Sequence, residues 1–262
     1  RKFLVSPKKR FIIQSILIFL FVIIIDLKIA SSRIWLFDII LNNTIFAYFF
    51  STFCLLILIN GSNFIDGLNG LLISYSLIVL YFLINLGLVD NLIISDKSIN
   101  LILLLLLLLL FLNISNILML GDSGAYLLGF FLGFIIISSH INSPNISPYF
   151  FITLIWYPCF ENLFSIIRKF NKKFSPLKPD SKHLHQLVFF FLKNKFKLNV
   201  ILSNNLSSII ICFFNFLIIF FSTLNPSNTI FQIQLIIFSV IFYNVIYILL
   251  NKFYKQKLGF KK

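Results

Sequence analysis

Apolar stretches of about 20 residues, separated by short polar segments, make up most of the chain. A helix of that length crosses the hydrocarbon core of a bilayer and satisfies its own backbone hydrogen bonds there. None of the stretches alternates polar and apolar residues as a membrane β-strand does. The sequence therefore predicts an all-α integral membrane protein, a polytopic helical bundle with about eight transmembrane helices. The predicted spans are residues 11–27, 43–60, 71–89, 99–118, 122–139, 148–167, 204–222 and 230–250.

Composition and charge distribution agree with this architecture. Hydrophobic residues make up 59% of the chain and charged residues only 11%, which excludes a soluble domain. The Lys and Arg residues concentrate in three segments, 1–10, 168–198 and 251–262. Because cytoplasmic loops carry an excess of these residues, we expect the three segments to face the cytoplasm. The prediction is one multi-pass domain over residues 1–262 in the cytoplasmic (inner) membrane, with 168–198 as a basic cytoplasmic loop.

The net charge of +14 follows from this topology. The cationic residues punctuate apolar stretches and form no basic face, so we expect no nucleic acid as a partner. Attraction of anionic lipid or of a phosphorylated substrate stays open as a second role. We expect the bilayer itself to be the main surroundings of the chain.

Small residues recur at every fourth position along the fifth predicted span, at Gly121, Ala125, Gly129 and Gly133. This spacing lets a neighbouring membrane helix approach closely, which predicts a central place for the span in the bundle. The alternative is that glycines are simply common in membrane helices.

A first polar cluster closes the second predicted span. Asn60, Asn63 and Asp66 are three residues apart, so a continuing helix would place them on one face, and Gly67 and Gly70 would allow a tight turn. Two amides and a carboxylate in a row suit hydrated Mg²⁺ or the polar edges of a nucleotide. Helix capping followed by a turn is the alternative. It does not explain three polar side chains that face one way.

Two more polar clusters fall on the same predicted face. Asp122 opens the fifth span, where it is either a helix N-cap or a metal ligand. His183 and His185 are two apart in the basic loop, so in an extended segment they point the same way. Neither Glu nor Cys stands near enough in sequence to complete a zinc site, so phosphate contact is favoured over zinc. Two solvated loop histidines are the alternative.

Two charged residues of the sixth predicted span also need an explanation. Arg168 ends the span, as a snorkelling anchor does. Glu161 lies within the span, where an unpaired charge is costly, so we expect a partner for it elsewhere in the chain.

Together, these clusters resemble a known family, the polyprenyl-phosphate N-acetylhexosamine-1-phosphate transferases of the WecA/MraY type (glycosyltransferase family 4). The similarity is carried by NGSNFIDGLNGL from Asn60, MLGDSGAYLLGF from Met119, YPCFENLFSIIRK from Tyr157 and SPLKPDSKHLHQL from Ser175, with SPKKRFIIQ from Ser6. Their order and spacing match over essentially the whole chain. The His-Leu-His-Gln string is closer to the WecA branch than to the MraY branch, which has three consecutive histidines.

The resemblance implies a Mg²⁺-dependent enzyme, with Mn²⁺ as an alternative ion. Such an enzyme transfers a sugar 1-phosphate, here of a UDP-N-acetylhexosamine, to undecaprenyl phosphate, releases UMP and so initiates a cell-envelope glycan. By analogy, Asp66, Asp122, His183 and His185 are catalytic, and Asp122 and Asn63 bind the metal. The substrate-binding residues implied are Asn60, Asn63, Gly67, Asn69, Arg168, Asp180, Lys182 and Gln186.

The resemblance also predicts what precedes the chain. The family has an Asp-Asp pair and three spans before the segment matched by residues 1–10, so we expect this chain to be the C-terminal portion of the family fold. Asn69 stands where many members have a second Asp, and Gln186 where they have His. The alternatives left open are an inactive or partner-dependent remnant, an MraY-type phospho-muramoyl-pentapeptide transferase, and a transporter. A homodimer is also left open.

Overall fold

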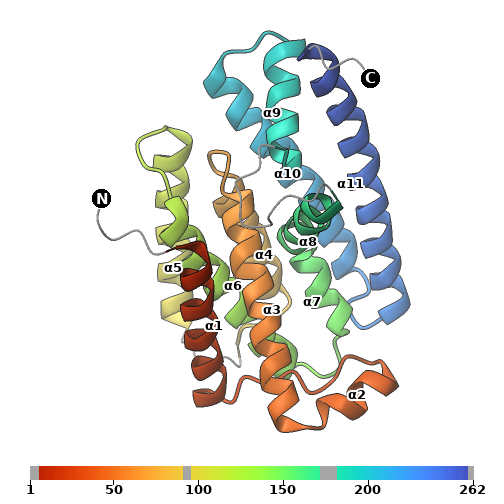
Figure 1. Ribbon diagram of the computed structural model, residues 1–262. Coiled ribbons are helices and arrows are strands. Elements are labelled where there is room, and N and C mark those ends of the chain that lie inside the picture. The colour runs from red at the N-terminus through yellow and green to blue at the C-terminus, as the bar shows by residue number, and fades with distance from the viewer. Residues whose placement is uncertain (1–5, 91–95, 172–181, 259–262) are drawn as a thin grey trace.

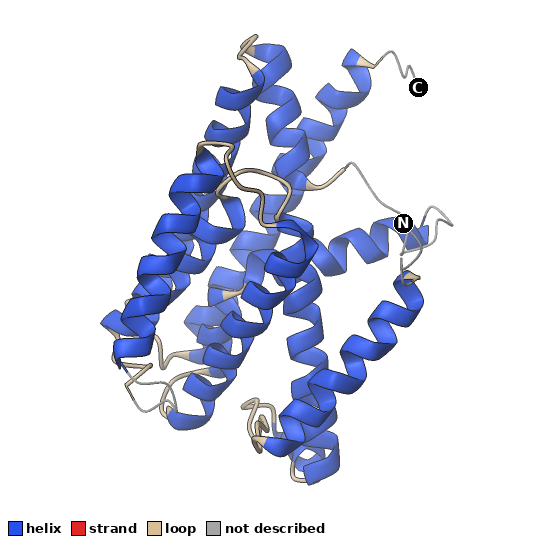
Figure 2. Ribbon diagram, turned by 90° about the vertical axis from the view of Figure 1, so that its left-hand side faces the viewer, coloured by secondary structure: helices blue, strands red, loops and turns tan. Residues whose placement is uncertain are grey.

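The computed structural model describes residues 6–90, 96–171 and 182–258. All regular structure in these ranges is helical, as predicted (Figure 1). Figure 2 shows most of the helices running side by side as a bundle. The helices are α1 (Pro7–Ile24), α2 (Trp35–Leu41), α3 (Thr44–Ile65), α4 (Leu71–Asn85), α5 (Asp96–Ile114), α6 (Gly121–Asn142), α7 (Pro148–Leu154), α8 (Trp156–Asn171), α9 (Leu184–Lys195), α10 (Val200–Thr223) and α11 (Thr229–Lys257).

Each of the eight predicted spans contains a helix, but fewer helices are long and apolar enough to cross a membrane. Of the described helices, α3, α5, α6, α10 and α11 qualify, which makes five, or six if α7 and α8 form one broken span. Helix α1 has only 18 residues, three of which are cationic, and α4 has only 15. The membrane character is supported, and the number of about eight is not confirmed.

Helix α3 lies at the centre of the bundle, where it packs against α1, α6 and α8. The small residues of α6 allow this packing. A methyl group added at Gly129 would lie 2.7 Å from Ser62 Oγ, and one added at Gly133 would lie 2.7 Å from Leu55 Cδ2. The predicted close approach is therefore confirmed for these two positions. Gly121 differs, because it begins α6 with a φ of 66° and a methyl group added there would meet no atom within 4 Å.

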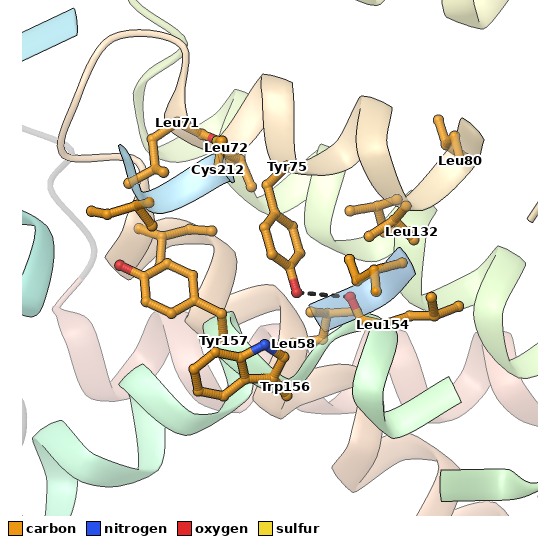
Figure 3. Close-up of a cluster of buried hydrophobic side chains, with 14 of the residues drawn as sticks. Leu58, Leu71, Leu72, Tyr75, Leu80, Leu132, Leu154, Trp156, Tyr157 and Cys212 are labelled. Carbon is orange, nitrogen blue, oxygen red and sulfur yellow. Dashed lines mark hydrogen bonds between the residues drawn. The ribbon is translucent and has the colours of Figure 1, made fainter. Parts of the chain in front are cut away.

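The span predicted as continuous over residues 148–167 is broken, which corrects the sequence interpretation. Helices α7 and α8 meet at Ile155 with a bend of 76°. Pro158 explains the break, because it has no N–H for the carbonyl of Leu154 and its ring would clash with that carbonyl in a continuous helix. The hydroxyl of Tyr75 on α4 donates to the Leu154 carbonyl at 2.7 Å instead (Figure 3). The bend is thus stabilised by a hydrogen bond from another helix.

The start of α8 fits closely against α3. A methyl group added at Gly61 would lie 2.3 Å from the carbonyl oxygen of Pro158, so only glycine permits this approach of two backbones. The amide of Asn162 on α8 donates to the carbonyl of Ile57 on α3 at 3.0 Å. These contacts hold the bent helix against the end of α3 that carries the first polar cluster.

We predict that Tyr75→Phe destabilises the protein by about 1–2 kcal/mol, because it leaves the buried Leu154 carbonyl without a donor. Unfolding in mixed detergent micelles measures the effect. Tyr81→Phe is the matched control on the same helix, since the Tyr81 side chain is 56% exposed. Equal stability of the two variants would show that the tyrosine hydroxyl does not stabilise the bend.

Candidate active site

The first polar cluster ends α3, as predicted. The helix continues to Ile65, and the backbone N–H of Asp66 still donates to Ser62 O at 3.1 Å. Helical spacing therefore holds across Asn60 and Asn63, both half-buried, and reaches Asp66. The amide of Asn60 donates to Leu56 O at 2.8 Å within the helix, which leaves its side-chain oxygen for other donors.

The turn after Asp66 is fastened to two other helices. Gly70 adopts a φ of 75°, so glycine is needed there. The backbone N–H of Asn69 donates to Asn204 Oδ1 on α10 at 2.7 Å, and its side-chain amide donates to Asn116 Oδ1 beyond α5. Asn69, predicted to bind substrate, is thus placed where both its backbone and its side chain hold the turn.

Asp122 lies in the first turn of α6 and is not an N-cap. The N-cap position belongs to Leu120, without a side-chain hydrogen bond, so the capping alternative is wrong. The Asp122 carboxylate is 62% exposed and forms an ion pair with Arg10 at 3.0 Å. The exposed carboxylate of Asp122 is accessible to a cation, and the half-exposed guanidinium of Arg10 is accessible to a phosphate.

Asp66 and Asp122 interact electrostatically although they come from different helices. Burial raises the pKa of Asp66 to about 7, and the negative charge of Asp122 acts in the same direction. A cation beside these carboxylates would offset the charge of Asp122, which otherwise favours the neutral form of Asp66. The structure therefore brings together the two acidic clusters that lie far apart in sequence.

The histidines lie at the start of α9 and not in a solvated extended loop. His183 precedes the helix and His185 belongs to its first turn, with 4% and 0% of their surfaces exposed. The two rings are nonetheless stacked, with centroids 5.6 Å apart and an interplanar angle of 10°. Gln186 supports this start of the helix, because its Oε1 accepts from the backbone N–H of His183 at 3.1 Å.

Gly67 and Phe64 join the histidines to the first cluster. A methyl group added at Gly67 would lie 2.3 Å from Nε2 of His185, so the imidazole packs directly on this turn. The ring of Phe64 stacks on that of His183 at 5.3 Å. The third predicted cluster thus contacts the first. The first and third clusters therefore form one site, where α3 ends and α9 begins.

His185 is a buried polar group with unused hydrogen-bonding capacity. Among the described residues, neither of its ring nitrogens has a hydrogen-bond partner. Burial lowers the pKa of His185 to about 4, although Glu161 nearby opposes this shift. At neutral pH the ring is therefore neutral, with one N–H donor and one acceptor nitrogen. An unsatisfied pair of this kind is typical of a position that a ligand completes.

Lys182 directly precedes His183, and Arg168 contacts the backbone carbonyl of Lys182. Arg168 is 8% exposed, which excludes the snorkelling interpretation. Its Nη1 donates to the carbonyl of Lys182 at 2.5 Å and to the hydroxyl of Tyr247 at 2.9 Å. The ammonium of Lys182 lies 5.8 Å from the centre of the Tyr254 ring. Asp180, predicted to bind substrate, lies outside the described residues.

The expected partner of Glu161 is present. The carboxylate, fully buried on α8, lies 2.9 Å from Nδ1 of His183 and accepts from the hydroxyl of Tyr243 at 2.7 Å.

Sequence reasoning did not identify Tyr243 and Tyr247. Their signal is two hydroxyl-bearing residues one helical turn apart in the last apolar stretch, where a polar atom needs a partner. Arg10 was missed as well, because it reads as one of several topology-determining cations.

Oxygen-bearing side chains at this end of the bundle are of the kind that bind Mg²⁺. Among the described residues, no group of three or more His, Cys, Asp or Glu side chains could hold a metal ion by itself. Mg²⁺ in enzymes is, however, commonly bound by one or two carboxylates, with water and substrate phosphates as the other ligands. Asp122 supplies such a carboxylate, and Asn63, one turn before Asp66 on α3, supplies an amide oxygen.

The fold and this site define a multi-pass membrane protein whose acidic and imidazole groups gather at one end of an apolar helical bundle. The sequence model of glycosyl transferase family 4 matches residues 3–140, more than half of the chain, and the chain belongs to this family. Neither a curated protein nor a solved structure matches the chain. The family supports a polyprenyl-phosphate sugar-phosphate transferase in general. The match includes both acidic clusters and ends before His183 and His185.

We predict a pH-dependent penalty from Asp66. Its pKa is raised from the ordinary value of 3.8 to about 7, so the folded protein retains a proton that the unfolded chain has lost between these values. The free energy of unfolding therefore falls as the pH rises from about 3.8 to about 7, and this loss is complete above about pH 7. Asp66→Asn should gain more stability relative to the wild type at pH 8.5 than at pH 5.5.

Thermal unfolding in detergent with a metal chelator measures this difference. Asp90→Asn removes an exposed carboxylate and controls for the general loss of a negative charge. The same gain for Asp66→Asn at both pH values would contradict the raised pKa.

Proposed function

We propose that the chain transfers an N-acetylhexosamine 1-phosphate from a UDP-sugar to undecaprenyl phosphate and releases UMP. The reaction would start a lipid-linked cell-envelope glycan at the cytoplasmic face of the inner membrane. The observation that carries this proposal is the convergence of Asp66, Asp122 and the paired histidines at one end of the bundle. Family membership supports the general reaction, and the His-Leu-His-Gln string favours the WecA-type donor over the larger MraY-type donor.

In this proposal the acidic residues serve charge neutralisation and proton uptake. Asp122, with Asn63 as a second ligand, would hold Mg²⁺ or Mn²⁺, which when bound neutralises the charge of the diphosphate. Asp66 has a pKa of about 7 and is suited to take a proton from the attacking lipid phosphate. Asn60 and Gly67 would border the nucleotide.

The histidines would contact the diphosphate of the donor. Neutral His185 can donate one hydrogen bond to a phosphate oxygen, which would satisfy a nitrogen that has no partner among the described residues. His183 lies beside it in the stacked pair. Arg168, Asp180 and Lys182 belong to the same basic segment in the sequence prediction. The cationic segments 1–10 and 168–198 would also attract the anionic donor and acceptor.

A transporter explains the polar residues less well. A permeation path needs polar side chains at the middle of the membrane and at both faces. The acidic and imidazole clusters instead gather at one end of the bundle, which is the arrangement that an interfacial transferase needs for one water-soluble and one lipid substrate.

The proposed reaction exchanges one phosphoanhydride for another, so we predict that it is freely reversible. Membranes loaded with the lipid-linked product should regenerate UDP-sugar when UMP is added in excess with Mg²⁺. Chromatography of radiolabelled nucleotide sugar measures the reverse reaction. CMP in place of UMP is the control for nucleotide selectivity. Product-loaded membranes that return no UDP-sugar would rule out direct exchange.

Asp122 and Arg10 form an ion pair, which allows metal binding to be separated from a structural role. We predict that Asp122→Asn in the full-length polypeptide lowers Mg²⁺-dependent transfer by about 100-fold or more. Arg10→Gln breaks the same ion pair but keeps the carboxylate, and should lower transfer much less. Initial rates across a Mg²⁺ titration measure both. Equal losses in the two variants would assign Asp122 to the ion pair and remove it from the metal site.

A further inference from the structure

Glu161 is the most deeply buried charged group near the proposed site, and the polar groups around it are hydrogen-bond donors to its carboxylate. Its side chain has no exposed surface. One oxygen, Oε1, lies 2.9 Å from Nδ1 of His183 and 3.4 Å from the backbone nitrogen of Leu184. The other, Oε2, accepts from the hydroxyl of Tyr243 at 2.7 Å. Three donors converge on one carboxyl group, which favours its charged form.

This arrangement determines which nitrogen of His183 carries a proton. An ionised carboxylate can only accept hydrogen bonds, so Nδ1 of His183 must be the donor. The remaining nitrogen, Nε2, is then the one available to a ligand. The backbone of His183 is held as well, because its N–H donates to Gln186 Oε1 at 3.1 Å. The ring is thus held at Nδ1 and at its own backbone.

Helix α11 contributes the tyrosine that binds the Glu161 carboxylate. Tyr243 and Tyr247 lie one turn apart on this helix, with their rings stacked at 6.1 Å. Tyr243 bonds to Glu161, and Tyr247 accepts from Arg168. Helix α8 therefore contacts the residues before α9 at two points: Glu161 at His183 and Arg168 at the carbonyl of Lys182.

We propose that Glu161 is a positioning residue, which fixes the proton on Nδ1 of His183 and so directs Nε2 toward a phosphate oxygen of the donor, with Tyr243 holding the carboxylate in place. The phosphate contact rests on the proposed function, whereas the position of the proton does not. The same logic operates wherever a carboxylate orients an imidazole by binding its second nitrogen.

The position of the proton can be measured without substrate. The chain has only three histidines, so ¹⁵N-histidine NMR of the full chain in detergent gives a small set of ring signals, which His183→Asn assigns. Nδ1 of His183 should be protonated in the wild type. Glu161→Met removes the acceptor at similar size and should move the proton to Nε2. Glu161→Gln keeps an acceptor oxygen and should largely restore the wild-type signal.

Activity provides the second readout. Glu161→Met should lower kcat by about 10- to 100-fold with KM changed by less than about threefold, because the substrate still binds but its leaving phosphate loses an oriented imidazole. Glu161→Gln should recover most of that loss. If wild-type protein shows no transfer at all, the proposed function fails, while the NMR result still decides the role of Glu161 toward His183.

Two tyrosine variants keep the test decisive if Glu161→Met does not fold. Tyr243→Phe removes a donor to Glu161 and should shift the Nδ1 signal of His183, whereas Tyr247→Phe removes a hydroxyl one turn away and should leave that signal unchanged. Protonated Nδ1 in a folded Glu161→Met protein would overturn the proposal. So would a relocated proton with unchanged kcat, or equal NMR shifts from the two tyrosine variants.

Discussion

The bend between α7 and α8 is the constraint on which the site depends. Pro158 cannot donate to the Leu154 carbonyl, and within an apolar bundle that carbonyl needs another donor. Tyr75 supplies it, so the chain can turn by 76° without an orphaned backbone group. The turn redirects α8 so that Glu161 and Arg168 meet the residues that start α9. A straight span would have carried both side chains along the bundle axis, away from the histidines.

Glycine at three places allows this geometry to be compact. Gly61 admits the backbone of Pro158, Gly67 admits the imidazole of His185, and Gly129 admits Ser62. Two of these glycines belong to α3 or the turn that follows it, and the third faces α3 from α6. Helices α6 and α8 therefore pack against α3, and the start of α9 packs against the turn that follows it. The polar residues at the end of α3 lie close to all three helices.

The sequence predicts the fold class and the residues of the candidate site better than it predicts the contacts between those residues. The helical bundle, the gathering of the three clusters and the partner for Glu161 follow from local rules, since a polar group in an apolar span needs a partner and helical spacing orders side chains on a face. The hydrogen bond that stabilises the bend at Ile155 comes from Tyr75, and the one that fastens Asn69 goes to Asn204, and both partners are remote in sequence. Helices α1 and α4, with 18 and 15 residues, are the two predicted spans that do not qualify as membrane-spanning helices.

The charge states at the site suit the highly charged diphosphate of the proposed donor. Burial holds Asp66 near a pKa of 7 and keeps His185 neutral, so at neutral pH these groups carry little fixed charge of their own. The Glu161 carboxylate accepts from three donors, and the Asp122 carboxylate is paired with Arg10. In the proposed function, such a site would accept a cation together with a diphosphate. As proposed above, Glu161 would orient the imidazole of His183 through Nδ1 and leave Nε2 for the anion.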